Sequence, residues 1–492
     1  MKSKWPIVRI DDIKAESKNA ITIGPFGSRM KSDCYVDSGV AVIRGTNLGS
    51  NPVFINNFVY ITEEKANELA SCNVYKDDLV FPHRGSIGEV GIVGGDLRYV
   101  LSSSLMKLTC DRKKAVPKFI YYFFKSSLGR HELLKNASQV GTPGIGQPLT
   151  SLKSIELPLP PLKIQKNTAT TLGLLDDKIQ LNHQINQTLE QIAQAIFKSW
   201  FVDFEPVKAR IAALEADGSE EDALLAAMQA ISGAALFDAD ASAAGAEEQL
   251  ARLQAERPEQ YAELRATAEL FPSAMQDSEL GEIPLEWSVG HLSELIQFNP
   301  RRSLKKGSLA PYLDMKNVPT SGHLAEDVVL RETNSGTKFI NGDTLLARIT
   351  PCLENGKTAY VDFLDSSQVG WGSTEYIVMR SQEPYPESIS YFVARDPIFR
   401  QHAIQSMTGT SGRQRANAKA LAELAWIVYP KALVKAFDRI ASPYLILARS
   451  HGNESRTLSD MRDTLLPKLL AGELSVPGTK YQTVEATEEA NV

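Results

Sequence analysis

The side chains of this chain best suited to specific chemistry are arginine, lysine, asparagine, glutamine and hydroxyl residues in polar loops. Arginine can make two hydrogen bonds to guanine, and asparagine or glutamine can make two to adenine, so such loops suit the reading of base edges in DNA. The candidates in the first half of the chain are Arg44, Asn47, His83, Arg84, Ser103, Gln139, Thr142 and Gln147. The candidates in the second half are Lys316, Asn317, Arg348, Asn355, Lys357, Thr374, Arg413, Gln414 and Arg415. For each residue taken alone, the alternative is a solvated side chain or a role in a turn. Because the candidates occupy matching positions in the two halves of the chain, the set as a whole favours binding to base edges.

Motifs that would support catalysis are incomplete. Asp396-Pro-Ile-Phe399 is similar to the loop with which aminomethyltransferases hold a flipped adenine, but Ile398 replaces the second proline and no glycine-rich cofactor loop precedes it. The segment 141–146 is rich in glycine but lacks the Lys-Ser/Thr pair of a phosphate-binding P-loop. Asp343 and Glu354 are too loosely spaced for a metal-dependent nuclease, and no serine nucleophile elbow is present. We therefore expect no catalytic residue.

Cysteine and histidine residues give no sign of a metal site. The four cysteines, Cys34, Cys72, Cys110 and Cys352, are far apart, and the seven histidines show no metal-ligand spacing. No run of about 18 apolar residues could span a membrane, and the N-terminus lacks the apolar core of a signal peptide. The sequence therefore predicts a cytoplasmic protein without a metal, a disulfide framework or a membrane segment.

The acidic charge of the chain is concentrated in one segment. The whole chain has a net charge of −6, whereas residues 207–282 alone hold 5 Lys+Arg and 16 Asp+Glu, a net charge of −11 that leaves +5 for the rest. Residues 1–160 hold 21 basic and 15 acidic residues and are mildly basic. Because nucleic-acid binding needs a local basic face and not a basic average, the overall acidity does not exclude DNA as a partner.

The elements that must position the candidate loops occur twice, at a spacing of about 269 residues. Val42–Asn47 in the first half matches Tyr312–Asn317, and Lys76–Phe81 matches Asn341–Leu346. Each half then has a serine- or threonine-rich step, a helix pattern, a glycine loop and an apolar strand that ends at proline. The two helix patterns cover 117–134 and 386–404, and the two strands end at Pro160 and Pro430.

A long helix with a coiled-coil seam follows each proline strand. Apolar and amide side chains recur at steps of three and four, which is the spacing of such a seam. The seam residues that we assign to the spacer and partner helices are Leu175, Ile179, Asn182, Asn186, Leu189, Ile196, Trp200, Leu458, Met461 and Leu465. Two such helices can pack antiparallel, and Asn182 and Asn186 could fix their register at some cost in stability. The alternative is that they are ordinary core helices of two unrelated domains.

The segment 207–282 separates the first long helix from the second half. Its alanine-rich pieces at 212–216 and 222–228 favour short helices, because alanine is the best helix former. The small and acidic stretch Gly233–Gly245 is typical of a flexible joint. A solvated spacer is the simplest interpretation of this segment, and DNA mimicry or a partner contact is the alternative.

These patterns together predict a mixed α/β (α+β) fold with pseudo-two-fold symmetry, in which two similar heads are joined by two long antiparallel coiled-coil helices. The expected parts are a first head at 1–158, a spacer helix region at 159–206, the acidic insert at 207–282, a second head at 283–430, a second spacer helix region at 431–475 and a disordered tail at 476–492. Two similar but unequal heads suit double-stranded DNA with two unequal half-sites on one face.

Several segments resemble the specificity subunit of type I restriction–modification systems, and the resemblance covers nearly the whole chain. The segments that carry it are Leu157–Gln165, Leu174–Ile179 with Asn182 and Asn186, Ile196–Glu205, Asp277–Pro284 and Leu465–Leu474. The second half departs from the pattern at His451-Gly452-Asn453-Glu454, which places a glycine within its long helix. In the family this helix would help to set the length of the gap between the two half-sites.

The resemblance implies that each head is a target-recognition domain for one half of a split, asymmetric DNA target, and that the chain itself is not an enzyme. The long helices would set the unspecified gap and dock two copies of an adenine-methylating subunit, and motor–nuclease subunits would join that core. S-adenosylmethionine, ATP and magnesium would belong to those partners, and this chain would hold no cofactor. The alternatives are a DNA-binding module of another defence or partition complex, a fused methyltransferase or nuclease, and a scaffold without sequence preference.

Overall fold

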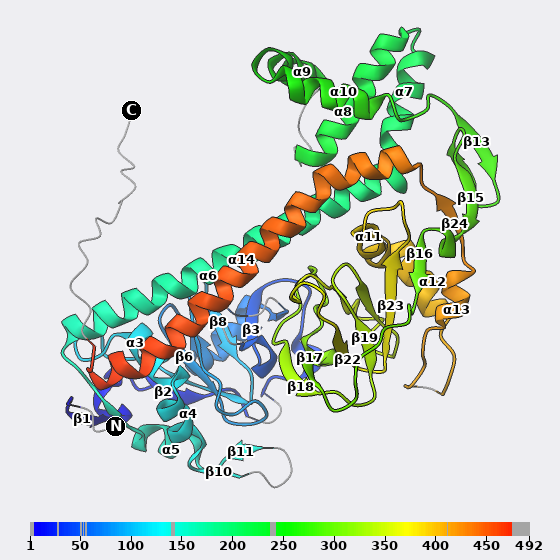
Figure 1. Cartoon of the computed structure of the whole chain (residues 1–492). Helices are drawn as coiled ribbons and strands as arrows, with labels where there is room; N and C mark the ends of the chain where they lie inside the picture. The colour runs from blue at the N-terminus through cyan, green and yellow to red at the C-terminus, as the bar shows by residue number, and fades with distance from the viewer. Residues whose placement is uncertain are drawn as a thin grey trace, which may run out of the picture. The chain divides into compact units, whose positions relative to one another are not determined.

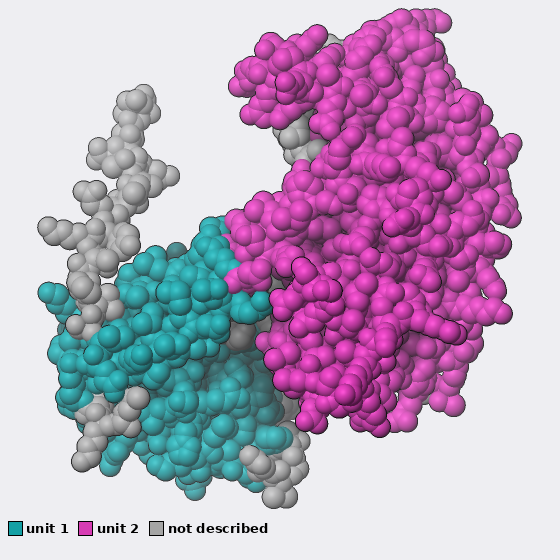
Figure 2. All heavy atoms as spheres, in the orientation of Figure 1, with its two compact units in different colours: residues 1–181, 454–492 teal, residues 182–453 magenta. Residues whose placement is uncertain are grey.

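The computed structural model describes residues 4–474 except 27–28, 50–51, 53, 55–56, 139–142, 237–242 and 411. The chain divides into two compact units, of which the first contains residues 1–181 and 454–492 and the second contains residues 182–453 (Figure 2). Each unit holds one head and one part of each long helix, and each is described by itself. Among the described residues, no helix is long and apolar enough to cross a membrane.

The head of the first unit is built on two four-stranded sheets (Figure 1). The strands of one sheet, in order, are β2 (Ile21–Ile23), β9 (Leu105–Leu108), β6 (Leu79–Pro82) and β7 (Gly91–Ile92). Those of the other are β4 (Val59–Ile61), β3 (Val40–Ile43), β8 (Tyr99–Leu101) and β5 (Asn73–Val74). Because β3 and β8 are parallel, the loops that follow them leave the sheet at the same edge.

Short helices and two small strand pairs complete the first head. They are α1 (Ile10–Ile13), α2 (Glu63–Glu68), α3 (Pro117–Lys125), α4 (Ser127–Leu134), α5 (Pro148–Ser154), the 3₁₀ turns η2 (Ser32–Cys34), η3 (Gly45–Asn47) and η4 (Ala70–Cys72), and the pairs β1 (Ile7–Arg9) with β12 (Glu156–Pro158) and β10 (Ala137–Ser138) with β11 (Gly144–Ile145). The aromatic face of α3, including Phe119 and Phe123, is buried against the sheet of β6 and β9 and against Leu172 and Leu469 of the long helices. One core therefore joins the head to its part of the helix pair.

The second head repeats this order of strands. One sheet has the order β16 (Ile296–Phe298), β23 (Tyr376–Ser381), β20 (Thr344–Ala347) and β21 (Thr358–Tyr360). The other has β18 (Val329–Glu332), β17 (Leu309–Leu313), β22 (Gly370–Gly372) and β19 (Thr337–Phe339), with β17 parallel to β22. The remaining elements of this head are the pair β15 (Ser288–His291) and β24 (Ala425–Val428), α11 (Ile389–Arg395), α12 (Pro397–Gln405), α13 (Ala418–Ala422), and the turns η5 (Leu292–Glu294) and η6 (Met315–Asn317). The predicted repeat is confirmed strand by strand.

The expectation of one helix over each of 117–134 and 386–404 is wrong, because each stretch forms two helices. Ser126 separates α3 from α4, and its hydroxyl accepts a hydrogen bond from Gly129 N. Asp396 separates α11 from α12 in the same way and accepts from Phe399 N. Pro397 follows it at the first helical position, where proline is favoured. Asp396-Pro-Ile-Phe399 is thus a helix N-terminus.

The long helices are α6 (Leu162–Phe201) and α14 (Lys431–Ala471). In the first unit Asp176 and Lys178 of α6 pair with Arg462 and Glu454 of α14, respectively. In the second unit Asn182 donates to His451 O and Asn186 to Ala448 O, so the helices run antiparallel in each unit. The glycine of His451–Glu454 does not interrupt α14. A Cβ atom on Gly452 would lie 2.8 Å from Leu324 Cδ1, so the missing side chain makes room for the second head.

Most of the residues predicted for the seam are buried or half-buried in the structure. Ile179, Asn182, Ile196 and Trp200 are buried, whereas Leu175, Asn186, Leu189, Leu458 and Leu465 are half-buried. Met461 is 48% exposed, so its assignment to the seam is wrong. Its neighbour Arg462 points inward instead and pairs with Asp176 of α6, because a buried carboxylate on the facing helix makes a charged position favourable there.

The insert of the second unit is an ordered helical subdomain. It contains α7 (Glu205–Glu215), α8 (Glu220–Leu236), α9 (Ala243–Glu256), α10 (Pro258–Ala268) and a hairpin of β13 (Met275–Ser278) and β14 (Gly281–Pro284). Leu224 and Met228 of α8 and Phe271 lie in the same buried cluster as Trp200 of α6. A merely solvated spacer is therefore the wrong description, because its apolar residues complete a core. The ends of the stretch predicted as a flexible joint are helical, and residues 237–242 lie outside the described residues, as does the predicted tail.

Candidate nucleic-acid interface

Four loops of the first head converge at one edge of its sheets. Three follow β3, β6 and β8, and the fourth precedes β11 and is described only at Pro143. His83 of the second loop contacts Ser103 O through Nε2 at 3.0 Å, and Gly85 N donates to Pro143 O at 2.9 Å. Ser86 Oγ donates to Gly45 O at 3.4 Å. These bonds hold the four loops as one surface, so the structure brings the predicted polar segments of this head together.

The predicted residues of the first head divide into supporting and exposed side chains. Asn47 is fully buried; its Oδ1 accepts from Arg44 N at 2.8 Å and its Nδ2 donates to Asn57 O at 3.1 Å. Arg44 also donates to Asn57 O, and His83 is 4% exposed with a pKa lowered by burial. These three side chains hold the loops. Arg84, Ser103 and Gln147 are exposed and face solvent, and Gln139 and Thr142 lie outside the described residues.

The same four loops converge in the second head. Arg348 N donates to Glu375 O at 2.9 Å, which joins the loop after β20 to the loop after β22. Thr350 N donates to Gln414 O at 3.1 Å, and Thr358 N donates to Pro319 O at 3.0 Å. The loop after β17, the loop after β20, the loop after β22 and the segment 408–416 therefore form one surface, as their counterparts do in the first head.

Several predicted residues of this second surface are used internally. Arg415 forms a bidentate ion pair with Glu375, with Nη2–Oε1 at 2.7 Å and Nε–Oε2 at 2.9 Å, which lowers the pKa of Glu375. Lys357 Nζ donates to Met315 O at 2.7 Å and to Lys316 O at 3.1 Å, and Asn317 Nδ2 donates to Asp327 O at 3.3 Å. The side chains left exposed are Lys316, Asn355, Thr374 and Arg413, and those left half-buried are Arg348 and Gln414.

A cleft beside these loops contains residues that the sequence analysis missed. Its volume is about 360 Å³, and Arg348 and Thr374 line it together with Asn299, Arg302 and Lys338. Asn299 and Arg302 could have been predicted from the sequence, because they belong to the basic run 299–306, Asn-Pro-Arg-Arg-Ser-Leu-Lys-Lys, directly after β16. Lys338 could not have been found, because it belongs to an edge strand far from that run in sequence.

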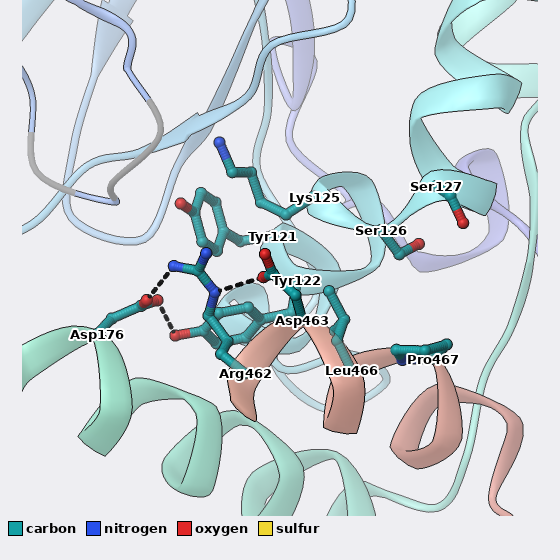
Figure 3. A pocket seen from close by; sticks show the side chains of 10 residues that line it. All are labelled: Tyr121, Tyr122, Lys125, Ser126, Ser127, Asp176, Arg462, Asp463, Leu466 and Pro467. Carbon is teal, nitrogen blue, oxygen red and sulfur yellow. Dashed lines mark hydrogen bonds and ion pairs between the residues drawn. The ribbon is translucent and has the colours of Figure 1, made fainter. Parts of the chain in front are cut away.

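In the first unit, the head is fixed to the helix pair through a tyrosine and a carboxylate. Tyr122 of α3 donates to Asp176 of α6 at 2.6 Å, and Arg462 of α14 donates to the other oxygen of Asp176 at 2.8 Å (Figure 3). Asp176 is 5% exposed, and burial beside it raises the pKa of Tyr122 far above its usual range. Lys125, Ser126 and Leu466 line the adjacent cavity of about 350 Å³.

In the second unit, a tyrosine at the same place in the repeat makes the same kind of contact. Tyr391, 269 residues after Tyr122, donates to Glu190 of α6. Glu190 Oε2 lies 3.8 Å from His323 Nδ1, and Asp362 Oδ2 lies 3.4 Å from His323 Nε2, distances of ion pairs and not of well-aligned hydrogen bonds. Burial opposes the charge of the ring, but the two carboxylates outweigh it and raise the pKa of His323 to about 9.

Arg395 extends this contact into the loops. Its guanidinium donates to the carbonyl oxygens of Thr320, Gly322, Gly356 and Thr358, and its Nε donates to Tyr391 Oη at 3.2 Å. The loops after β17 and β20 are thereby tied to the tyrosine that binds α6. The candidate surface of the second head is consequently supported by the helix, not only by its own sheets.

Carboxylates that could have held a metal have structural partners instead. Asp343 is fully buried and accepts from Ile340 N at 2.9 Å, Arg302 Nη2 at 3.1 Å and Arg380 Nη1 at 3.0 Å. Glu354 is exposed. In the part of the chain that the structure describes, no group of three or more His, Cys, Asp or Glu side chains could hold a metal ion. What the arrangement offers is binding by polar loops on rigid supports.

Comparison with known proteins finds the following similarities. The family model of the type I restriction modification DNA specificity domain matches residues 3–191. The chain is 28% identical over 449 residues to the HindI specificity subunit of Haemophilus influenzae, covering 87% of this chain and 94% of that one. It is 31% identical over 159 residues to the MjaIX specificity subunit of Methanocaldococcus jannaschii, covering 31% of this chain and 35% of that one. A solved type I restriction–modification S subunit from M. genitalium is similar with a TM-score of 0.47 and 14% identity, covering 95% of this chain and 96% of that chain.

Proposed function

We propose that this chain is a non-catalytic specificity subunit of a type I restriction–modification system, and that its two heads each read one half of a split, asymmetric DNA target. The observation that carries the proposal is that the same four loops converge in each head and leave polar side chains exposed there. In the first head these are Arg84, Ser103 and Gln147, and in the second they are Lys316, Asn355, Thr374 and Arg413. The side chains differ between the heads, which supports two unequal half-sites.

Division of the target between two heads follows from the energetics of base reading. A correct base pair contributes roughly 1–3 kcal/mol against a mismatch, so one small head discriminates weakly. Linking two heads makes the second binding event intramolecular, and the two contributions combine. The supports described above, Asp176 with Arg462 in the first unit and Glu190 with His323 in the second, suit this role because separating a buried pair leaves an uncompensated charge, which is costly.

The partners in this proposal are double-stranded DNA and the other subunits of a restriction–modification complex, working in the cytoplasm. α6 and α14 act as the spacer that sets the gap in the target, and they dock two methylating subunits, which motor–nuclease subunits join. S-adenosylmethionine, ATP and magnesium are bound by those subunits. The residues of this chain supply sequence recognition and position the partners, and none of them performs a chemical step.

The decisive experiment maps modified adenines by single-molecule sequencing in the native host, with the gene intact, deleted and restored on a plasmid. We expect one split, asymmetric motif to lose its methylation on deletion and to regain it on complementation. Complementation with a variant that carries alanine at Lys316, Asn355 and Arg413 should lose or change the half of the motif read by the second head only. An unchanged methylome in deleted cells that express the methylating partner would contradict the proposal.

A further inference from the structure

We propose that the cleft between the two sheets of the second head binds a phosphate of the DNA backbone through Lys338 and Arg348. The inference rests on the proposed function and deepens it, because it assigns Arg348 to the backbone and not to a base edge. It also adds Lys338, which no sequence pattern had indicated. The cleft has a volume of about 360 Å³, ample for a phosphate group and its water.

Both sheets of the head contribute to the cleft. Asn299 and Arg302 follow β16, Arg348 follows β20, and Thr374 precedes β23, while Thr337 and Lys338 belong to β19 at the edge of the other sheet. Arg348 and Thr374 also belong to the converging loops, so the cleft is continuous with the exposed surface of those loops. A strand of DNA that contacts the loops would therefore pass the mouth of the cleft.

The cleft contains two cations, Lys338 and Arg348, that form no ion pair within the described part of the chain. Of the nearby carboxylates, Asp343 pairs with Arg302 and Arg380, and Glu375 pairs with Arg415 while its charge also acts on Arg348. Arg348 Nε is buried without a hydrogen-bond acceptor among the described residues. Buried donors of this kind cost free energy unless a ligand satisfies them.

The charged side chains of the cleft, Lys338 and Arg348, offer only donors, which favours a phosphate over a base edge. Asn299 Oδ1 accepts from Val378 N at 3.0 Å, and its NH₂ group can add a further donor. Base edges present both donors and acceptors, whereas phosphate oxygens only accept. A phosphate, which only accepts hydrogen bonds, therefore suits the donors of Lys338, Arg348 and the threonine hydroxyls.

The first head lacks this cation. In the second head Lys338 lies opposite Trp371 on β22, and in the first head Asn73 lies opposite Val100 on the matching strand β8. Asn73 is 3% exposed and donates to Ala66 O at 3.1 Å, so it is a core residue. The phosphate contact is therefore specific to the second head, and the two heads bind the backbone unequally.

The test measures the salt dependence of DNA binding by the chain in complex with its methylating partner. The probes are a duplex that contains the methylated motif and a duplex of random sequence. Each lost phosphate contact lowers the slope of log K against log salt by about 0.9, which is about eightfold in affinity at 0.1 M salt. We expect this loss for Lys338→Gln and for Arg348→Gln, on both duplexes alike, and retention of the parent slope for Lys338→Arg and Arg348→Lys.

Arg331→Gln is the matched control, because Arg331 is an exposed arginine on β18, at the opposite edge of the same sheet from β19. Its slope should equal that of the parent. Parent-like slopes for Lys338→Gln and Arg348→Gln would overturn the inference, as would a loss confined to the motif duplex, since that is the result of base reading. A parent complex that binds both duplexes equally would contradict the proposed function instead, so the two failures are distinguishable.

Discussion

Single buried charges hold the candidate surfaces in place. Asp78 in the first head and Asp343 in the second occupy the same turn before β6 and β20, and each carboxylate accepts from a backbone N–H three residues earlier. Each is also paired with a basic side chain, Lys107 at 3.2 Å and Arg302 at 3.1 Å. The sequence shows these aspartates as ordinary turn residues, because the basic partner comes from a distant strand or loop.

Lys107→Met should therefore destabilise the first unit far more than a surface substitution of the same kind. It leaves the Asp78 carboxylate, 4% exposed, without its cation, and breaking a buried pair costs about 3–5 kcal/mol. The matched control is Lys76→Met, whose partner Asp96 is 88% exposed and whose ion pair contributes under about 1 kcal/mol. Urea denaturation measures both, and equal losses would show that Asp78 does not depend on Lys107.

The raised pKa of His323 makes the stability of the second unit depend on pH. Its pKa is about 9 in the folded chain, against an ordinary value of 6.5, so the folded state binds more protons between these values. The stabilisation is fully present below pH 6.5 and is lost as the pH rises to 9, a fall of about 3 kcal/mol in the free energy of unfolding. Denaturation between pH 6 and 9.5 measures the slope, and His323→Gln should remove it. A parent without this slope would refute the buried charge.

At the scale of elements, one capping residue separates the two short helices of each head, Ser126 in the first head and Asp396 in the second. Ser126 is buried, accepts from Gly129 N at 3.1 Å and donates to Phe123 O at 2.6 Å. Gly129 is required beside it, since a Cβ atom there would lie 2.1 Å from Phe123 O. The break lets α3 bury its aromatic face while α4 leaves in another direction. It also places Tyr122 opposite Asp176.

Ser126→Ala should cost about 1 kcal/mol of stability, the usual contribution of an N-cap hydroxyl. Ser127→Ala, one residue further on at an exposed position, is the control and should change stability by less than about 0.5 kcal/mol. Thermal unfolding monitored by circular dichroism compares the two. If both variants unfold at the parent temperature, the hydroxyl of Ser126 contributes nothing as a cap.

At the scale of the whole molecule, polar contacts on the helix seam bear on how the target gap is set. In the second unit Asn186 Nδ2 donates to Ala448 O at 3.0 Å, and His451 Nδ1 lies 3.1 Å from Asn186 Oδ1. Asn182 Nδ2 donates to His451 O at 3.4 Å. Polar side chains at such positions fix register at a cost in stability.

The double variant Asn182→Leu, Asn186→Leu should accordingly unfold at the parent temperature or above it, while the gap in the methylated motif becomes less strict. Adenine mapping in the complemented host should then show added methylation at motifs whose gap differs by one base pair. Leu189→Ile, an apolar change on the same seam, is the control and should keep the parent motif. A single unchanged gap in the double variant would show that the apolar seam alone fixes the register.

The order of elements could be predicted from the sequence, because it depends on local patterns. Strand alternation, proline stops and the three–four spacing of Ile179, Ile196 and Trp200 are readable within a few residues, and the repeat then shows that one architecture is used twice. The same patterns gave a single helix where Ser126 makes two. Capping competes with helix continuation there, and only the packing of α3 decides between them.

The candidate loops were found for the same reason, since matching loops follow matching strands. Which of their side chains are free was decided by tertiary structure alone. Judged from the sequence, Asn47 and Arg415 are equally good candidates for contacting a base. In the structure Asn47 is buried within its own loop, and Arg415 is paired with Glu375. Whether a polar group is satisfied depends on partners 10 to 40 residues away. The two cations Lys338 and Arg348 likewise line one cleft only because folding brings an edge strand and a loop together.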